Sequence, residues 1–379
     1  MTGPAYPAAR AVAATVEDRF ARLIAAARDA GRQDLAPEPD AGVVEAVIDA
    51  AFWASLRREE GRSPRISLAF LPPERAGQPL LFTRPLPLAP GPLTRLAPAV
   101  EGPGIHLGVW RGPGGPYVWG ATHSIPPLTL VVEVVEPGLL VVKYRRGEEF
   151  GKFGNVAVLQ GDQVKEVDEH GGTVPDCPAL LSTLLGLEAP ASWGDAVNGL
   201  VQIAVSMRRH GRGGSLLVVP GASEAWRESI VHPIAYGVTP PFDELAGLML
   251  REPEERSDPE WQDALTRVVD LVGGLTAVDG ATVVTDRYEL LAFGAKIVRR
   301  AGSVPVEQVF VTEPVVGGVA GAAPPGEIGG TRHMSAAQFV HDQRDALALV
   351  ASQDGRFTIF AWSPCEHMVH AHRVETLLM

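Results

Sequence analysis

Apolar positions near the start of the chain recur at the spacing of a helix. In residues 8–31, apolar side chains such as Val12 and Val16 return every three or four positions, and residues 42–58 repeat that pattern. Each segment therefore has one apolar face and one polar face, as in a helix that covers a core. We expect an N-terminal helical segment over residues 1–62.

From about residue 65 the pattern changes to short apolar or alternating runs separated by Gly and Pro. A period of two with turn residues between the runs predicts β-strands. We expect a β-rich sensory or regulatory domain over residues 63–175, with Pro-rich loops at 72–103. The predicted strands are the runs ISLAF, PLLF, GIHLGVW, PYVWGA, LTLVVEVV, LLVVKY and NVAVL.

From about residue 178 helical and strand patterns alternate, which indicates an α/β layer around one sheet. The predicted fold class is therefore α/β: a C-terminal domain over residues 190–364 with a central mixed β-sheet flanked by helices, preceded by a helical and β-rich part, and followed by a tail over residues 365–379. A Gly- and Pro-rich stretch, residues 313–330, is predicted to be a long loop. The predicted helices are 178–187, 193–210, 224–232, 241–250 and 259–273, and the predicted strands are 215–220, 281–285, 289–294, 306–311, 346–352 and 357–362.

Composition excludes several classes of protein. Hydrophobic residues make up 46% of the 379 residues, enough for packed cores, and this excludes a disordered chain. The 45 acidic against 33 basic residues give a net charge of −12, so we expect no nucleic-acid partner. Two cysteines form no disulfide framework. Without a recognisable signal peptide, and with its longest apolar run too short to cross a bilayer, the chain is expected to be cytoplasmic with no membrane partner.

Two polar segments of the C-terminal half have residue types that suit a metal ion and a triphosphate. In residues 278–284 the Asp279 carboxylate stands beside a glycine at the mouth of a strand, and Mg²⁺ or Mn²⁺ prefers such oxygen ligands. Residues 330–337 begin a helix, whose free N–H groups and dipole favour an anion, and Arg332 adds a bidentate phosphate contact. The alternatives are an ordinary Asp-Gly turn and a helix that Thr331 merely caps.

A second cluster of possible ligands lies near the C-terminus. Cys365, His367, His370 and His372 combine thiolate and imidazole groups that bind zinc, although their spacing matches no standard zinc site. The alternative is a terminal strand or helix with exposed histidines. A Gly-x-Ser-x-Gly hydrolase elbow and a phosphate-binding GxxxxGK[ST] loop are both absent from the sequence.

Residues from about 192 to 362 resemble a diadenylate cyclase (DAC) domain, as in the DNA-integrity scanning protein and the membrane-linked cyclic di-AMP synthases. That family has an Asp-Gly-Ala motif, then Gly-Thr-Arg-His-Arg before an Ala-rich helix, and Ser-Glu or Ser-Gln where a strand ends. The two longer motifs are jointly specific. In this sequence the corresponding residues are Asp279-Gly280-Ala281, Gly330-Thr331-Arg332-His333-Met334 and Ser352-Gln353.

The resemblance implies that two facing DAC domains of a homodimer or higher homo-oligomer each hold one ATP. With Mg²⁺ or Mn²⁺, the two ATP molecules condense to cyclic di-AMP and two pyrophosphates, mostly through positioning and charge stabilisation. In that reaction the 3′-hydroxyl of each ATP attacks the α-phosphate of the other. Asp279 would hold the metal and help to activate this hydroxyl. The other implied roles are phosphate binding by Thr331, Arg332 and His333, close approach of the nucleotide to Gly280 and Ala281, hydrogen bonds from Ser335 and Ser352, nucleotide binding by Gly330 and Gln353, and an adenine wall at Leu291 and Phe293.

This sequence departs from the family pattern at Met334, which stands where the motif has its second Arg. A methionine donates no hydrogen bond to a phosphate, and losing such a donor commonly costs ~2–4 kcal/mol in the transition state. The candidates to replace it are Arg299, Arg300, Arg344 and Arg356. Three interpretations remain open: a working cyclase with a rearranged phosphate clamp, a module that binds a nucleotide or cyclic dinucleotide without turnover, and a scaffold. The chain is similar to a group described as probable sensor proteins with a variant DAC domain.

Overall fold

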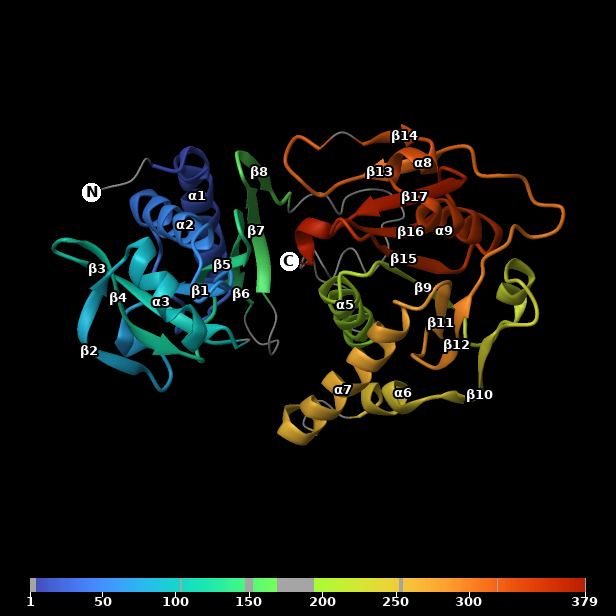
Figure 1. Cartoon of the computed structure of the whole chain (residues 1–379), viewed down its shortest axis with the longest axis horizontal. Helices are drawn as coiled ribbons and strands as arrows, with labels where there is room; N and C mark the ends of the chain where they lie inside the picture. Colours follow the sequence, from blue (N-terminus) through green and yellow to red (C-terminus); the bar gives the residue numbers. More distant parts are fainter. Residues whose placement is uncertain are drawn as a thin grey trace. The chain divides into compact units, whose positions relative to one another are not determined.

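The computed structural model divides into two compact units (Figure 1). Unit 1 runs from Met1 to Val167, and unit 2 from Asp168 to Leu378. Each contains a mixed β-sheet and packed helices, so the predicted α/β fold class is confirmed. The residues that the structure describes are 5–102, 104–146, 153–168, 194–251, 255–318 and 320–378.

Unit 1 is built on a sheet of eight strands in the order β2-β4-β3-β1-β5-β6-β7-β8. Strands β1 and β3 are parallel, and the other pairs are antiparallel. The strands are β1 (Ile66–Phe70), β2 (Leu80–Pro87), β3 (His106–Gly112), β4 (Gly115–Thr122), β5 (Leu130–Glu136), β6 (Leu139–Arg145), β7 (Phe153–Gln160) and β8 (Gln163–Glu166). The helices are α1 (Pro7–Asp29), α2 (Ala41–Ser55), the 3₁₀ turn η1 (Pro73–Arg75) and α3 (Pro90–Val100).

Helices α1, α2 and α3 share one apolar core with one face of this sheet. Phe20 of α1, Ile48 of α2 and Leu93 of α3 are fully buried in it together with Leu68 of β1 and Leu107 of β3. The N-terminal helices and the β-rich segment therefore form a single packed body, because the apolar face of each helix is buried against the sheet.

The predicted Pro-rich loops at 72–103 are wrong for most of that range, which contains β2 and α3. Helix α3 begins with Pro90 in its first turn, where the missing N–H has no helical acceptor to lose. Leu93, Ala97 and Val100 then recur at helical spacing and are buried. The prolines suggested a break, although Pro90 and Pro92 lie in the first turn of α3 and the helix also accommodates Pro98 in its interior.

Unit 2 contains a sheet of nine strands in the order β10-β12-β11-β9-β15-β16-β17-β13-β14. Its strands are β9 (Gly214–Val219), β10 (Tyr236–Phe242), β11 (Ala281–Thr285), β12 (Leu290–Ala295), β13 (Val309–Thr312), β14 (Gly321–Ala323), β15 (Leu347–Ala351), β16 (Phe357–Ser363) and β17 (Met368–Arg373). Its helices are α5 (Gly194–Arg209), η2 (Ala225–Ser229), α6 (Glu244–Met249), η3 (Glu255–Ser257), α7 (Pro259–Leu275), α8 (Pro325–Ile328), α9 (Thr331–Asp342) and η4 (Glu375–Leu377).

Helix α9 covers the middle of this sheet, where it contacts β9, β15, β16 and β17. Phe339 of α9 is fully buried with Leu217 and Val350 of the sheet. Because side chains alternate along a strand, Leu216 and Leu349 point to the opposite face, and they are buried there as well. Helix α5 contacts β15 and packs on α7, so apolar side chains are buried on both faces of the sheet.

Three further expectations for unit 2 need correction. The predicted helix at 224–232 is the short 3₁₀ turn η2, and the predicted loop at 313–330 contains β14 and α8. The segment expected to be a terminal tail contributes β17, which pairs with β16 and β13 inside the sheet. The histidines in that segment hid the strand pattern, since His370 and His372 are polar yet buried. The predicted helix at 178–187 lies outside the described residues.

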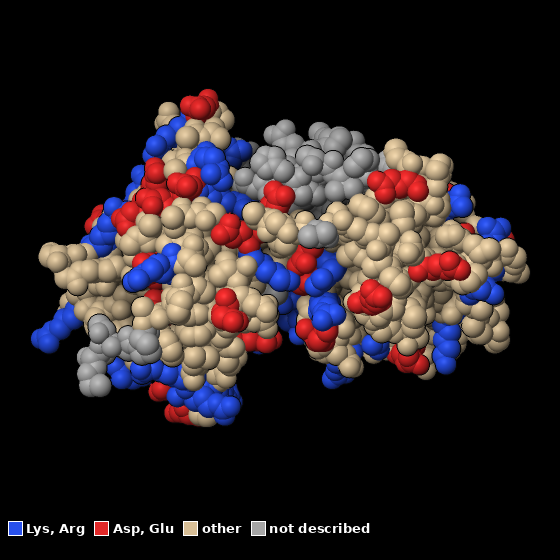
Figure 2. Space-filling view, turned by 90° about the horizontal axis from the view of Figure 1, so that it is seen from above, with Lys and Arg blue, Asp and Glu red and all other residues tan. Residues whose placement is uncertain are grey.

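Among the described residues, none of the helices has the length and hydropathy needed to span a bilayer. The face in Figure 2 shows acidic and basic side chains interspersed over both units, as expected from a composition with both signs of charge.

Candidate functional site

Pairing within the second sheet brings the predicted motifs to one edge. Strand β9 runs parallel to β11, with Ser215 beside Ala281, and antiparallel to β15, with Gly214 beside Ala351. The starts of β9 and β11 therefore lie next to the end of β15. The Asp-Gly pair just before Ala281 and the Ser-Gln pair just after Ala351 are thus at the same edge of the sheet, although they are far apart in sequence.

The first turn of α9 reaches this edge through Arg332. Gly213, immediately before β9, has a φ of +71°, and a β-carbon there would lie 3.1 Å from Nη1 of Arg332. The same β-carbon would lie 3.3 Å from the carbonyl oxygen of Ala351 and from Cγ of Gln353. Gln353 also donates from Nε2 to the carbonyl oxygen of Arg212, at 3.3 Å. Arg332 and Gln353 therefore meet over Gly213, which brings two of the three motifs into contact.

The Asp-Gly turn before β11 has a shape that only glycine accommodates easily. Gly280 has a φ of +109°, and a β-carbon on it would lie 2.5 Å from the carbonyl carbon of Gly294. This close approach holds Asp279 against the end of β12. Asp279 is exposed, and neither an ion pair nor a side-chain hydrogen bond involves its carboxylate among the described residues. The Asp279 carboxylate can therefore bind a ligand without breaking a protein contact.

An aromatic pair beside this turn joins Phe293, a predicted adenine contact, to Tyr236, which the sequence did not predict. The rings of Tyr236 and Phe293 stack with centroids 4.8 Å apart and planes 4° apart, and Tyr236 remains 51% exposed. A β-carbon on Gly294 would lie 2.7 Å from Cδ2 of Tyr236, so the pair adjoins the turn of Gly280. Leu291, the other predicted adenine contact, packs against the core on the α9 side. No strand was predicted at Tyr236, because two prolines follow it closely.

Gly330, Thr331 and Met334 at the start of α9 are exposed, Arg332 is half-buried and His333 is buried. Gly330 occupies the N-cap, so the interpretation of Thr331 as the cap is wrong. Thr331 is exposed and Ser335 is half-buried, and neither makes a side-chain hydrogen bond within the described residues. Free N–H groups of a helix start stabilise an anion, and the exposure of Gly330 and Thr331 leaves them accessible.

His333 points into the protein, whereas Arg332 lies at the edge of the sheet. Its imidazole is 98% buried, its Nε2 lies 3.3 Å from Oγ1 of Thr358, and its ring packs edge-to-face on Phe360 at 6.0 Å. Burial lowers the pKa of His333, with smaller effects from nearby Asp354, Arg356 and Arg332. A buried, neutral imidazole at pH 7 positions the helix start rather than adding charge to a phosphate site.

The structure distinguishes between the arginines that could replace the missing motif residue. Arg356 lies in the turn after β15 and pairs with Asp354 at 3.3 Å. This turn is at the edge of the sheet where Asp279, Arg332 and Gln353 lie, which we call the motif edge. Arg300 lies at the other end of α9, where its backbone N–H donates to Asp342, and Arg344 follows that end of the helix. Met334 itself is 46% exposed. Arg356 is thus the candidate at the motif edge.

Ser352 supports this turn. Its hydroxyl donates to the carboxylate of Asp354, which is the largest cause of the lowered pKa of Asp354, while burial opposes the shift and Arg356 adds to it. Ser352 and Arg356 also share a backbone hydrogen bond of 2.9 Å from N to O. The turn is therefore fixed, and it presents the guanidinium of Arg356 beside the start of α9.

The side chains at this edge are compatible with a divalent ion only if a bound ligand also coordinates that ion. No group of three or more His, Cys, Asp or Glu side chains suited to a metal occurs in the described residues. Mg²⁺ commonly binds one or two carboxylates together with substrate phosphates and water, and the exposed Asp279 fits that role. The C-terminal residues Cys365, His367, His370 and His372 also form no such group; His370 and His372, which the alternative interpretation expected to be exposed, are buried.

A comparison with protein families matches residues 33–123 to a family described as "Probable sensor domain DACNV". The matched segment lies within unit 1 and includes α2, α3 and strands β1 to β4. A search of curated proteins finds no match for this chain. The similarity therefore concerns the N-terminal part and supports its interpretation as sensory, while the DAC resemblance of unit 2 rests on its own residues.

Proposed function

We propose that unit 2 is a DAC-type domain that binds ATP or cyclic di-AMP, and that unit 1 is a sensor that regulates it. The meeting of Arg332, Gln353 and Gly213 beside the Asp279 turn is the observation that supports this proposal most strongly. Separate segments with anion-binding, metal-binding and close-approach residues meet at one edge, as a triphosphate site requires. The sensor assignment draws on the family match in unit 1.

In the synthetic reaction that we propose, two copies of the chain face each other and each holds one ATP. Arg332 and the N–H groups at the start of α9 bind phosphate oxygens and stabilise charge that develops there. Asp279 would hold Mg²⁺ or Mn²⁺, and the bound ion would neutralise phosphate charge. Gly280 keeps the backbone close to the nucleotide, and the Tyr236–Phe293 pair offers an aromatic surface to a base.

A binding role without turnover is the second candidate, and Met334 favours it. The side chain at 334 supplies no donor to a phosphate, and Arg356, the arginine at the motif edge, is already paired with Asp354. With one fewer charge-assisted contact in the transition state, the domain would hold a nucleotide and report on it rather than convert it.

One pair of measurements separates these functions. Purified full-length protein is incubated with ATP and Mg²⁺ or Mn²⁺ at high protein concentration, and cyclic di-AMP is sought by chromatography. Calorimetry with ATP and with cyclic di-AMP is run in parallel on the wild type and Arg332→Gln. Product formation supports the cyclase, whereas binding without product, lost in Arg332→Gln, supports the sensor. The absence of both turnover and binding would reject the proposal.

A further inference from the structure

Unit 2 contains a pocket at the end of α9 opposite to the motif edge. It has a volume of about 620 Å³, within the usual range for small-molecule sites. Arg332 and Asp342 are ten positions apart on α9, a distance of about 15 Å along the helix. The pocket is therefore separate from the candidate nucleotide site. Its polar lining includes Ser223, Arg300, Ser303, His341, Asp342 and Arg344.

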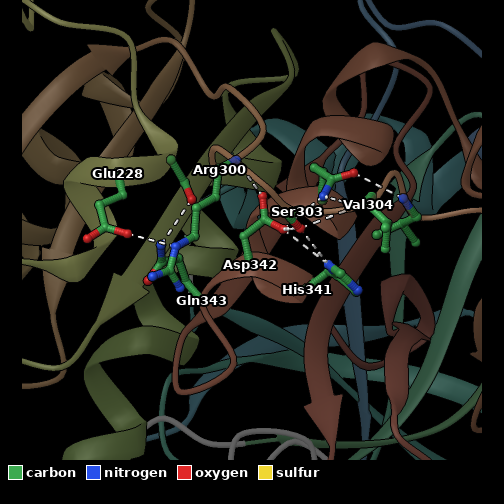
Figure 3. Close-up of polar contacts among 10 residues, drawn as sticks. Glu228, Arg300, Ser303, Val304, His341, Asp342 and Gln343 are labelled. Atoms are coloured by element: carbon green, nitrogen blue, oxygen red, sulfur yellow. Dashed lines mark hydrogen bonds and ion pairs between the residues drawn. The ribbon is translucent and has the colours of Figure 1, made fainter.

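The buried carboxylate of Asp342 holds one wall of this pocket in place (Figure 3). It accepts hydrogen bonds from the backbone N–H of Arg300 at 2.8 Å, from the Ser303 hydroxyl and from Gln338 Nε2 at 2.9 Å. His341 Nδ1 lies 3.1 Å from the same carboxylate. Burial raises the pKa of Asp342, but these hydrogen bonds outweigh it, and the pKa is lowered overall. The carboxylate is thus ionised and fully engaged.

Two glutamines fasten neighbouring segments to α9. Gln338 accepts from the backbone N–H of Val306 at 3.0 Å, and Gln343 donates to the carbonyl oxygen of Ala225 and to the hydroxyl of Ser229, both at 3.0 Å. The loop before Val306 and the turn η2 are therefore both anchored to the helix. A pocket fixed in this way needs little reorganisation to receive a ligand.

Two guanidinium groups, those of Arg344 and Arg300, line the pocket. Arg344 lies 4.1 Å from the centroid of the Trp362 ring, and no carboxylate partner of Arg344 is found among the described residues. A guanidinium stacked by its face keeps its N–H edge for an oxyanion. Arg300 pairs with Glu228 at 2.7 Å, and Figure 3 shows this pair beside Asp342. Both partners are about half exposed, so an anion can compete for Arg300.

We propose that this pocket binds a small organic phosphate, independently of the nucleotide site. Arg300 and Arg344 contact the phosphate oxygens, and Ser223 adds a hydroxyl donor from the opposite segment. The engaged carboxylate of Asp342 does not repel the anion strongly, because several donors surround it. Asp345, the remaining acidic residue of the lining, is exposed and screened by solvent.

Calorimetry on the full-length protein with glycerol 3-phosphate, and with uncharged glycerol as the matched probe, tests this inference. We expect saturable binding of the phosphate only. Arg344→Gln and Arg300→Gln should each weaken it about tenfold or more, since each removes a charge-assisted contact. Arg300→Gln keeps the backbone N–H that donates to the Asp342 carboxylate, so this wall of the pocket remains in place.

Two control variants make the test specific. Arg332→Gln changes the motif edge, and Arg267→Gln removes an exposed charge from α7; both should leave glycerol 3-phosphate binding unchanged. Thermal melts establish that every variant is folded. No saturable binding by the wild type, or binding that survives both pocket variants, would overturn the inference. Loss of binding in Arg332→Gln alone would instead assign the phosphate to the motif edge. That result would also overturn the proposal that the pocket binds the phosphate.

Discussion

The side chain of Arg332 lies directly over Gly213, so close that a β-carbon at position 213 would sit 3.1 Å from its Nη1 atom. The two residues belong to segments that are more than a hundred positions apart, the first turn of α9 and the loop before β9. Their contact depends on the absence of a side chain at position 213. This dependence can be tested directly.

Gly213→Ala should weaken ATP binding by about tenfold or more, because the new methyl group displaces Arg332, and small misplacements of a positioning group are costly. Gly211→Ala is a matched control: Gly211 has a similar φ of +63°, but a β-carbon there meets nothing within 4 Å. Both variants should lose ~1 kcal/mol of stability to backbone strain. Calorimetric affinities that fall equally in both would show that the contact with Arg332 does not matter.

Gly280→Ala should destabilise unit 2 by ~2–4 kcal/mol, because its β-carbon would overlap the backbone of Gly294 and its φ is unfavourable for alanine. Gly274→Ala, near the end of α7 and in open space, should instead gain up to ~1 kcal/mol from helix propensity. Urea unfolding measures both. A Gly280→Ala variant as stable as the wild type would mean that the turn before β11 can relax.

The sequence pattern predicted elements best where burial is continuous. Strand β11 spans the five residues predicted for it, since all five are buried and apolar or β-branched. The pattern failed where strands contain polar residues or prolines, as with the buried His370 of β17 and the prolines of β10. In these strands tertiary contacts override the local signal.

For the site, the motifs predicted which segments carry the chemistry, but not the direction of each side chain. Arg332 and His333 are neighbours on α9, and successive helical residues point about 100° apart. The packing of α9 on the sheet decides that His333 faces the core and Arg332 faces Gly213. Tyr236 was not predicted, because its approach to Gly294 depends on a pairing between two strands far apart in the sequence.

Met334→Arg should raise the affinity for ATP by about tenfold, because it restores a charge-assisted contact at the start of α9. Met334 is 46% exposed, so the longer side chain is accommodated and stability should change by less than ~0.5 kcal/mol. Calorimetry with ATP measures the effect, and the product assay shows whether turnover accompanies it. An unchanged affinity would indicate that Arg356 already supplies the contact. In that case Arg356→Gln should lower the affinity for ATP.

Because His106 is buried, we expect the stability of unit 1 to depend on pH. His106 is 96% buried on β3, and Ser67 Oγ lies 2.7 Å from its Nδ1. Burial is the main cause that lowers its pKa to about 4, Lys143 adds to the shift, and Glu133 opposes it. In the unfolded chain histidine titrates near ~6.5, so between these values the unfolded state binds more protons.

Stability of unit 1 should therefore fall as the pH drops from about 6.5 towards about 4, with a loss of the order of 2 kcal/mol between pH 7 and pH 5. His106→Gln keeps a polar group for Ser67 but cannot take up the proton, so its urea midpoint should lose most of this pH dependence. His123→Gln changes an exposed histidine just beyond β4 and should keep the slope of the wild type. Equal slopes in all three proteins would mean that His106 is not the group whose protonation destabilises unit 1.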